Sequence, residues 1–82
     1  MSEPRKLKSF TVEIARKLQM EPYIWKSTDK LYNISGRFYQ TPKLFWLILW
    51  ANKKGIEQDI IVGEVIYIPL SLEKTLSLAL ED

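Results

Sequence analysis

The chain has 82 residues and a formal net charge of +2, and 46% of its residues are hydrophobic while 27% are charged. These values allow one small globular domain with short arms, exclude a disordered chain and give no argument for a nucleic-acid partner. The absence of Cys and His removes disulfides, thiolates, the commonest general base and the commonest metal ligand, so we expect no enzyme, no metal site and no cofactor.

Residues 1–22 are expected to form an N-terminal arm, and two patterns compete within it. Apolar residues alternate over 10–14, which is typical of a half-buried strand, but the wider apolar spacing over 7–18 fits a helix face about as well. The pair Thr11-Val12 favours the strand, and Pro22 ends whichever element forms. The start of the arm is charged and lacks the apolar segment of a secretory signal peptide, so we expect no such signal.

Residues 23–69 are predicted to form the folded domain. The domain begins with a short strand of β-branched and aromatic residues at 23–26. Asp29 is in position to cap a helix that follows, and this helix has an apolar face that includes Leu31 and Ile34. The first half of the domain is therefore a strand followed by a helix.

A second helix is predicted to begin with Thr41 as its cap and Pro42 at its first position, where the missing N–H costs nothing. Its body is a run of eight consecutive apolar residues at 44–51. A membrane-spanning helix needs about 20 such residues, so we expect no membrane span. We expect Gly55 to stop the helix in a left-handed conformation, and residues 65–69 to form the closing strand.

The apolar run divides into two helix faces when residues are placed about 100° apart. The face expected to pack in the core consists of Phe45, Ile48 and Leu49. The face expected to point outward consists of Trp46, Leu47 and Trp50. Two tryptophans one turn apart on an outer face favour a partner-binding surface, because Trp is enriched at interface hot spots. The alternative is that the arm or the tail of the same chain folds back over them.

The C-terminal tail, residues 70–82, also fits two structures. Some of its leucines recur at the spacing of a helical stripe, and an even spacing of leucines fits one face of a strand. Its apolar side needs a surface in either form, and that surface is either this chain or a neighbouring subunit. The candidate partner-binding residues of the tail are Leu72, Leu76 and Leu80.

Several residues of the 23–69 segment occur together in the order and spacing of a known pattern. They are Ser27, Asp29, Leu31, Ile34, Phe38-Tyr39, Pro42, Ala51-Asn52, Gly63 and Ile66-Tyr67-Ile68-Pro69. This set resembles the lysin motif (LysM) family over somewhat more than half of the chain. The resemblance implies an α+β fold of βααβ order, with both helices packed on one side of a two-stranded antiparallel sheet.

The resemblance also offers a glycan-binding function as an alternative. LysM domains that bind peptidoglycan or chitin, which are N-acetylglucosamine glycans, use the loop after the first strand and the loop after the second helix. The residues at these places are Ser27, Thr28, Asp29, Lys30 and Asn52. The family's Gly-Asp-Thr pattern is reduced here to Thr28-Asp29-Lys30, which weakens the glycan interpretation.

The apolar outer positions of the second helix are instead similar to LysM-like domains in the baseplate and tail proteins of bacteriophages. This resemblance implies a non-enzymatic structural protein of the virion, assembled in the host cytoplasm. Its partners would be other tail or baseplate proteins in a hetero-oligomeric assembly, held by protein–protein contacts. The predicted partner-binding residues are Trp46, Leu47, Trp50, Leu72, Leu76 and Leu80.

Overall fold

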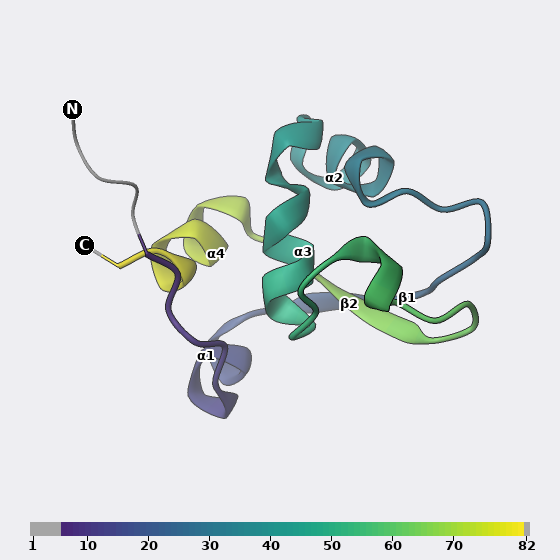
Figure 1. Cartoon of the computed structure of the whole chain (residues 1–82). Helices are drawn as coiled ribbons and strands as arrows, with labels where there is room; N and C mark the ends of the chain where they lie inside the picture. Colours follow the sequence, from purple (N-terminus) through teal and green to yellow (C-terminus); the bar gives the residue numbers. More distant parts are fainter. Residues whose placement is uncertain (1–5, 82) are drawn as a thin grey trace.

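The computed structural model describes residues 6–81 and has the α+β composition that the sequence predicts (Figure 1). Its four α-helices and two strands are, in chain order, α1 (Val12–Lys17), β1 (Met20–Ile24), α2 (Leu31–Tyr39), α3 (Phe45–Ala51), β2 (Val65–Pro69) and α4 (Leu72–Ala79). Two short 3-10 helices, η1 (Pro42–Leu44) and η2 (Glu57–Asp59), precede and follow α3.

The two strands pair antiparallel, from Met20 opposite Pro69 to Ile24 opposite Val65. The closing strand lies where the sequence predicts it, and the first strand begins at Met20 instead of Tyr23. The sheet buries one face of β2, since Ile66 and Ile68 are fully enclosed while their neighbours Val65 and Tyr67 remain exposed. This alternation is the two-residue period of a strand with one face in the core.

Side chains, and not a third strand, close the outer edge of β2. The Asn52 amide Nδ2 donates to the Tyr67 carbonyl at 2.8 Å, and its Oδ1 accepts from the Tyr67 N–H at 2.8 Å. The Tyr39 hydroxyl donates to the carbonyl of Pro69 at 2.6 Å, and Pro69 itself has no N–H to offer. Burial raises the pKa of Tyr39, so this hydroxyl keeps its proton and remains a donor. The backbone of β2 is therefore satisfied on both sides over these residues.

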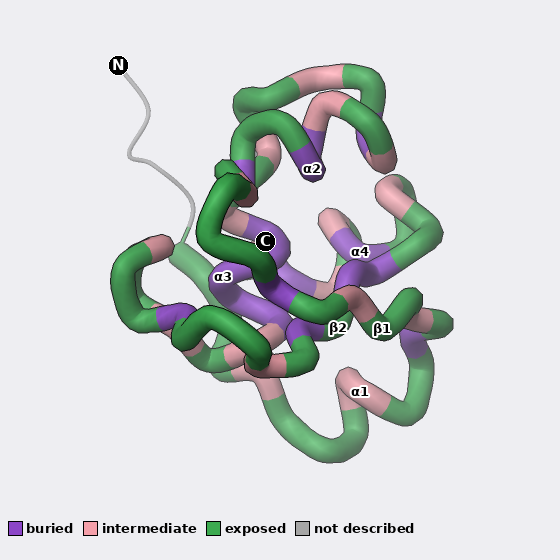
Figure 2. The backbone as a smooth tube through the Cα atoms, turned by 90° about the vertical axis from the view of Figure 1, so that its right-hand side faces the viewer, coloured by how far each residue is buried: buried purple, intermediate pink, exposed green. Residues whose placement is uncertain are grey.

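Helix α3 is the central element of the core, and it contacts β2, α2 and α4. In Figure 2 buried residues concentrate on α3 and β2, and further ones lie on α2 and α4. The largest apolar side chains that are fully enclosed are Leu31, Ile34, Leu47, Ile48, Ile66 and Ile68. The helix predicted after the first strand thus buries Leu31 and Ile34, as its apolar face indicates.

The strand predicted in the N-terminal arm is wrong, because residues 12–17 form α1. The Thr11 hydroxyl accepts the Ile14 N–H at 3.2 Å and caps this helix. Arg16 and Lys17 lie in the last turn, where their charge suits the helix dipole. The alternation over 10–14 has no neighbouring strand to pair with at this place, so the local capping decides the structure.

The cap predicted for α2 is also wrong. The N-cap position is Lys30, and its side chain makes no capping hydrogen bond. Asp29 instead closes the preceding turn, where its carboxylate accepts from the Lys26 N–H at 2.7 Å and from the Tyr23 hydroxyl at 2.9 Å. The first N–H of α2, that of Leu31, donates to the Glu57 carboxylate at 2.6 Å. A residue of η2 therefore supplies the cap.

The predicted start of the second helix is confirmed, and its predicted stop is not. The Thr41 hydroxyl accepts from the N–H of Lys43 at 3.3 Å, and Pro42 begins η1, which leads into α3. The left-handed residue after α3 is Lys53, with φ of 54°, and not Gly55. The Asn52 side chain donates to the Ile48 carbonyl at 2.7 Å and satisfies the last turn of the helix. This polar cap leaves Gly55 no role as the stop.

The tail takes the helical alternative and packs on its own chain. The Ser71 hydroxyl caps α4, and Leu72 and Leu76 pack half-buried against the core. Beyond α4, Leu80 forms an antiparallel bridge with Leu7 of the arm. The arm and the tail are thus held to each other within one chain.

Candidate functional site

The predicted division of α3 into an inner and an outer face is wrong at three positions. Leu47 and Trp50, expected outside, are buried with 0% and 8% exposed area, while Phe45, expected in the core, is 40% exposed. The reason is that α3 is covered from several directions, since β2, α2 and α4 all contact it. A helix at the centre of a small core has no single outer face.

The N-terminal arm covers Trp50. The indole Nε1 of Trp50 donates to the Lys8 carbonyl at 2.6 Å, and the Phe10 ring meets the indole edge-on, with centroids 4.9 Å apart and planes at 83°. The Lys8 N–H in turn donates to the Ala79 carbonyl at 2.8 Å. For Trp50, the alternative in which the chain folds back over its own tryptophan is therefore the one observed.

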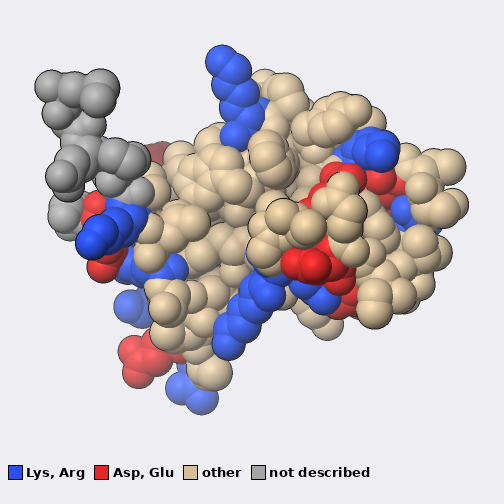
Figure 3. Space-filling model, viewed as in Figure 1, with Lys and Arg blue, Asp and Glu red and all other residues tan. Residues whose placement is uncertain are grey.

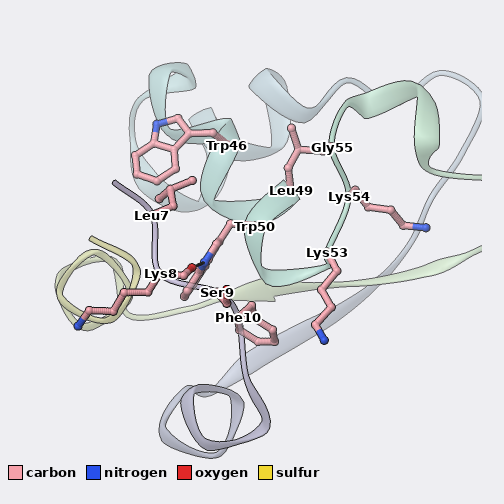
Figure 4. Close-up of a pocket in the computed structure, with 10 residues that line it drawn as sticks. All are labelled: Leu7, Lys8, Ser9, Phe10, Trp46, Leu49, Trp50, Lys53, Lys54 and Gly55. Carbon is pink, nitrogen blue, oxygen red and sulfur yellow. Dashed lines mark hydrogen bonds between the residues drawn. The ribbon is translucent and has the colours of Figure 1, made fainter. Parts of the chain in front are cut away.

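Two hollows adjoin along α3 and share Trp46, Leu49 and Gly55 in their walls. The first, of about 610 Å³, lies between α3 and the arm at 7–10 (Figure 4). The second, of about 570 Å³, lies between α3 and η2. We call the two together the α3 groove.

Large apolar side chains stand exposed at the walls of the α3 groove. They are Leu7 at 47%, Tyr32 at 52%, Phe45 at 40% and Ile56 at 56% exposed area. Trp46 is half-buried and packs against the core beneath them. This surface is of the kind that a partner chain would cover.

The rim of the α3 groove is mostly basic. Within residues 6–81 the ion pairs join Lys26 to Asp29 and Lys54 to Glu64, the latter at 2.8 Å, so the ammonium groups of Lys8, Lys30 and Lys53 have no carboxylate partner there. Figure 3 shows a wide uncharged surface over α3, with basic side chains along its border and acidic ones gathered near η2.

The acidic side of the groove is already engaged. The Glu57 carboxylate caps Leu31, and the Asp59 carboxylate accepts from the N–H groups of Gly55 and Ile56 at 3.2 Å each. The unengaged charge at the groove is therefore positive.

The structure places the predicted partner-binding residues in three locations. Trp46 and Trp50 line the α3 groove, whereas Leu47 is enclosed in the core. The tail residues lie elsewhere and are half-buried within this chain; they are Leu72, Leu76 and Leu80. Sequence reasoning missed the groove residues Tyr32, Phe45 and Ile56. Ile56 is the one with a visible signal, because it is a lone apolar residue in a polar stretch after Gly55.

The residues of the glycan alternative are not brought together as one set. Thr28, Asp29 and Lys30 line a polar pocket of about 330 Å³ beside Tyr23, while Ser27 is exposed and outside it. Asn52 is bound by both ends of its amide to the backbone of α3 and β2.

The polar pocket is held by a small network around Tyr23. The Lys26 ammonium donates to the Tyr23 hydroxyl at 2.7 Å and lies 4.2 Å from the ring centroid. Partial burial raises the pKa of Asp29. Hydrogen bonds from the Lys26 N–H and the Tyr23 hydroxyl, together with the Lys26 charge, lower this pKa by more, so it lies below its ordinary value. Asp29 is thus an ionised acceptor already occupied by its own loop.

Within residues 6–81 no cluster of three or more Asp or Glu side chains has the geometry to hold a metal ion, and no helix has the length and apolar character needed to cross a membrane. Comparison with protein-family models, with curated proteins and with solved structures found no match to this chain. The α3 groove and the polar pocket are therefore the features from which a function is argued.

Proposed function

We propose that this chain is a non-enzymatic, LysM-like structural protein of a bacteriophage tail or baseplate, and that it docks a neighbouring subunit in the α3 groove. The observation that carries the proposal is the pair of adjoining apolar hollows along α3, in which Tyr32, Phe45 and Ile56 remain exposed beside Trp46. Large aromatic side chains in a hollow are the typical anchors of a protein interface.

The size and charge of the groove support a protein partner. Burial of an aromatic side chain stabilises a complex by about 25 cal/mol per Å² of apolar surface removed from water. Several such side chains together can therefore hold a partner protein. Lys8, Lys30 and Lys53 border the groove without a carboxylate partner within residues 6–81, and positive charge near an interface favours the rate and register of association.

The LysM-like part of the proposal is supported by the order of elements. Between Met20 and Pro69 the chain runs β1, α2, α3, β2 with antiparallel strands, and this is the element order that the resemblance implies. The virion setting and the hetero-oligomeric partners come from the resemblance to LysM-like phage proteins. The proposal places assembly in the host cytoplasm.

The test is co-expression with the products of the flanking genes, followed by purification and mass spectrometry of the complex. The informative variant is Phe45→Glu, because a negative charge in the first turn of α3 suits the helix dipole and should leave the fold intact. Lys74→Glu, at an exposed position of α4, is the matched control. We expect a stoichiometric complex with a tail or baseplate protein that survives in the control and is lost in Phe45→Glu.

Retention of the complex in Phe45→Glu would contradict the proposal. So would flanking genes that encode no tail protein and products that form no complex with this chain. Circular dichroism and thermal unfolding of the variant alone establish that any loss is not a loss of fold.

A second candidate function, glycan binding, has one observation in its favour. Three residues of the predicted glycan loop, Thr28, Asp29 and Lys30, line a single polar pocket beside an aromatic ring, that of Tyr23. Sedimentation with purified peptidoglycan tests it. Saturable binding that falls in Lys30→Ala and is unchanged in Phe45→Glu would support the glycan function, and absence of co-sedimentation would exclude it.

A further inference from the structure

The arm is held to the tail along one of its edges. The Lys8 N–H donates to the Ala79 carbonyl at 2.8 Å, and the Glu81 N–H donates to the Lys6 carbonyl at 2.9 Å. These two bonds flank the antiparallel bridge between Leu7 and Leu80. In this arrangement the N–H and C=O of Leu7 itself point away from the tail.

On the side of the arm that faces α3, the Lys8 carbonyl accepts from the Trp50 indole, but the backbone groups of its two neighbours are open. Within residues 6–81 the backbone N–H and C=O of Leu7 and Ser9 make no hydrogen bond. Both residues line the α3 groove, and Figure 4 shows the arm running between α4 on one side and α3 on the other. Open backbone groups of the arm, at Leu7 and Ser9, therefore lie along the wall of an apolar groove.

The remaining strand edges are less available. The outer edge of β2 is closed by Asn52 and Tyr39, and the outer edge of β1 carries Pro22, which has no N–H. The arm is thus the place where an added strand would find both open backbone groups and an apolar floor.

Charge complementarity indicates the composition of that strand. Lys53 lines the same hollow as Leu7 and Ser9 and has no carboxylate partner within residues 6–81, whereas Figure 4 shows the Lys8 ammonium directed toward α4. The floor beneath is apolar, with Trp46, Leu49 and Trp50. A strand that fits presents apolar side chains on alternate positions toward the floor and acidic side chains toward the rim.

We propose that the occupant of the α3 groove is an extended segment of a partner protein, with apolar residues at alternate positions and acidic residues between or beside them, added as a strand to the free edge of the arm at Leu7 and Ser9. This inference rests on the proposed docking function of the groove and specifies the chemistry of the partner.

The probe is a peptide selected from random displayed sequences of about 12 residues. Wild-type chain is the bait, and Phe45→Glu removes peptides that bind elsewhere. We expect the selected peptides to alternate apolar residues and to be rich in Asp and Glu. The most enriched peptide is then synthesised and titrated against wild-type chain.

Two measurements on the complex read the strand addition directly. Amide hydrogen exchange of Leu7 and Ser9 should slow when the peptide binds, whereas that of Ile24 on the β1 edge should not change. Ser9→Pro removes one open N–H and should weaken binding about tenfold, while Ser9→Ala, which keeps it, should bind like wild type. Lys53→Glu should weaken binding about threefold to fivefold at low salt, with Lys74→Glu as the control.

The outcomes separate the inference from the function on which it rests. Selected peptides with apolar residues at helical spacing, or equal binding by Ser9→Pro and Ser9→Ala, overturn the strand while leaving groove docking in place. Self-association of wild type that is lost in Phe45→Glu overturns it in favour of a second copy. A selection that leaves no Phe45-dependent peptide counts against both.

Discussion

The carboxylate of Glu57 accepts the backbone N–H of Leu31 at 2.6 Å, so the first turn of α2 is capped by a residue 26 positions later in the chain. This bond fixes η2 against the start of α2. It thereby positions one wall of the α3 groove, which Tyr32 of α2 and Ile56, next to η2, both line. The groove depends on a long-range cap.

Replacing Glu57 with Ala should therefore destabilise the fold by about 1–2 kcal/mol, the usual cost of losing a helix cap. Glu57→Gln keeps an acceptor oxygen and should lose less. Urea unfolding of both variants, with exposed Gln58→Ala as control, measures the difference. Equal stability of Glu57→Ala and wild type would show that water caps Leu31 as well as the carboxylate does.

Asn52→Asp should be more damaging than its size suggests. The variant keeps the acceptor for the Tyr67 N–H but loses both donated bonds, to the Ile48 and Tyr67 carbonyls. It also places a carboxylate against those two carbonyl oxygens. We expect a loss of about 2–3 kcal/mol in the free energy of unfolding, because hydrogen-bonded groups are left unpaired. Thermal unfolding of Asn52→Asp against Lys53→Ala, its exposed neighbour, checks this; a loss no larger than that of the control would contradict it.

Asp29 should give stability that depends on pH. Its folded pKa lies below the unfolded value, since hydrogen bonds from Lys26 and Tyr23 outweigh the effect of partial burial. A depressed carboxyl pKa means that the stabilisation is present above the unfolded pKa, about 3.9, and is lost as pH falls through the folded pKa. The difference in unfolding free energy between wild type and Asp29→Asn should thus shrink below about pH 4. A difference that stays constant from neutral to acid pH would rule out this linkage.

Trp50→Phe should loosen the arm without opening the core. Phe lacks the indole N–H that donates to the Lys8 carbonyl but retains a ring for Phe10 to pack on. We expect about 1 kcal/mol less stability and faster amide exchange at Lys8. Trp46→Phe, whose indole makes no hydrogen bond within residues 6–81, is the control and should leave exchange at Lys8 unchanged.

Elements with local signals could be predicted from the sequence. The helix over 31–39 follows from its apolar face, the Thr41-Pro42 start from helix chemistry, and the strand at 65–69 from β-branched residues between turns. The spacing of the tail leucines fitted both a helix and a strand, and the helix is the one that forms. These signals depend on neighbours a few residues apart, and they are visible in one sequence.

The parts that could not be predicted depend on distant residues. Asp29 has the position of a cap, yet Tyr23 and Lys26 occupy its carboxylate, and Glu57 takes over the role. The buried and exposed faces of α3 could not be predicted from a helical projection. Such a projection does not show that the arm covers Trp50 or that Phe45 remains exposed. The candidate site is assembled from these same long-range contacts, so its residues were the hardest to name.

The bridge between Leu7 and Leu80 has a topological consequence. Because the Lys6 carbonyl accepts from the Glu81 N–H at 2.9 Å, the first and last residues that the structure describes lie side by side. Such a unit can be spliced into a surface loop of a larger host protein, or circularly permuted through a short linker, with little disturbance of either partner.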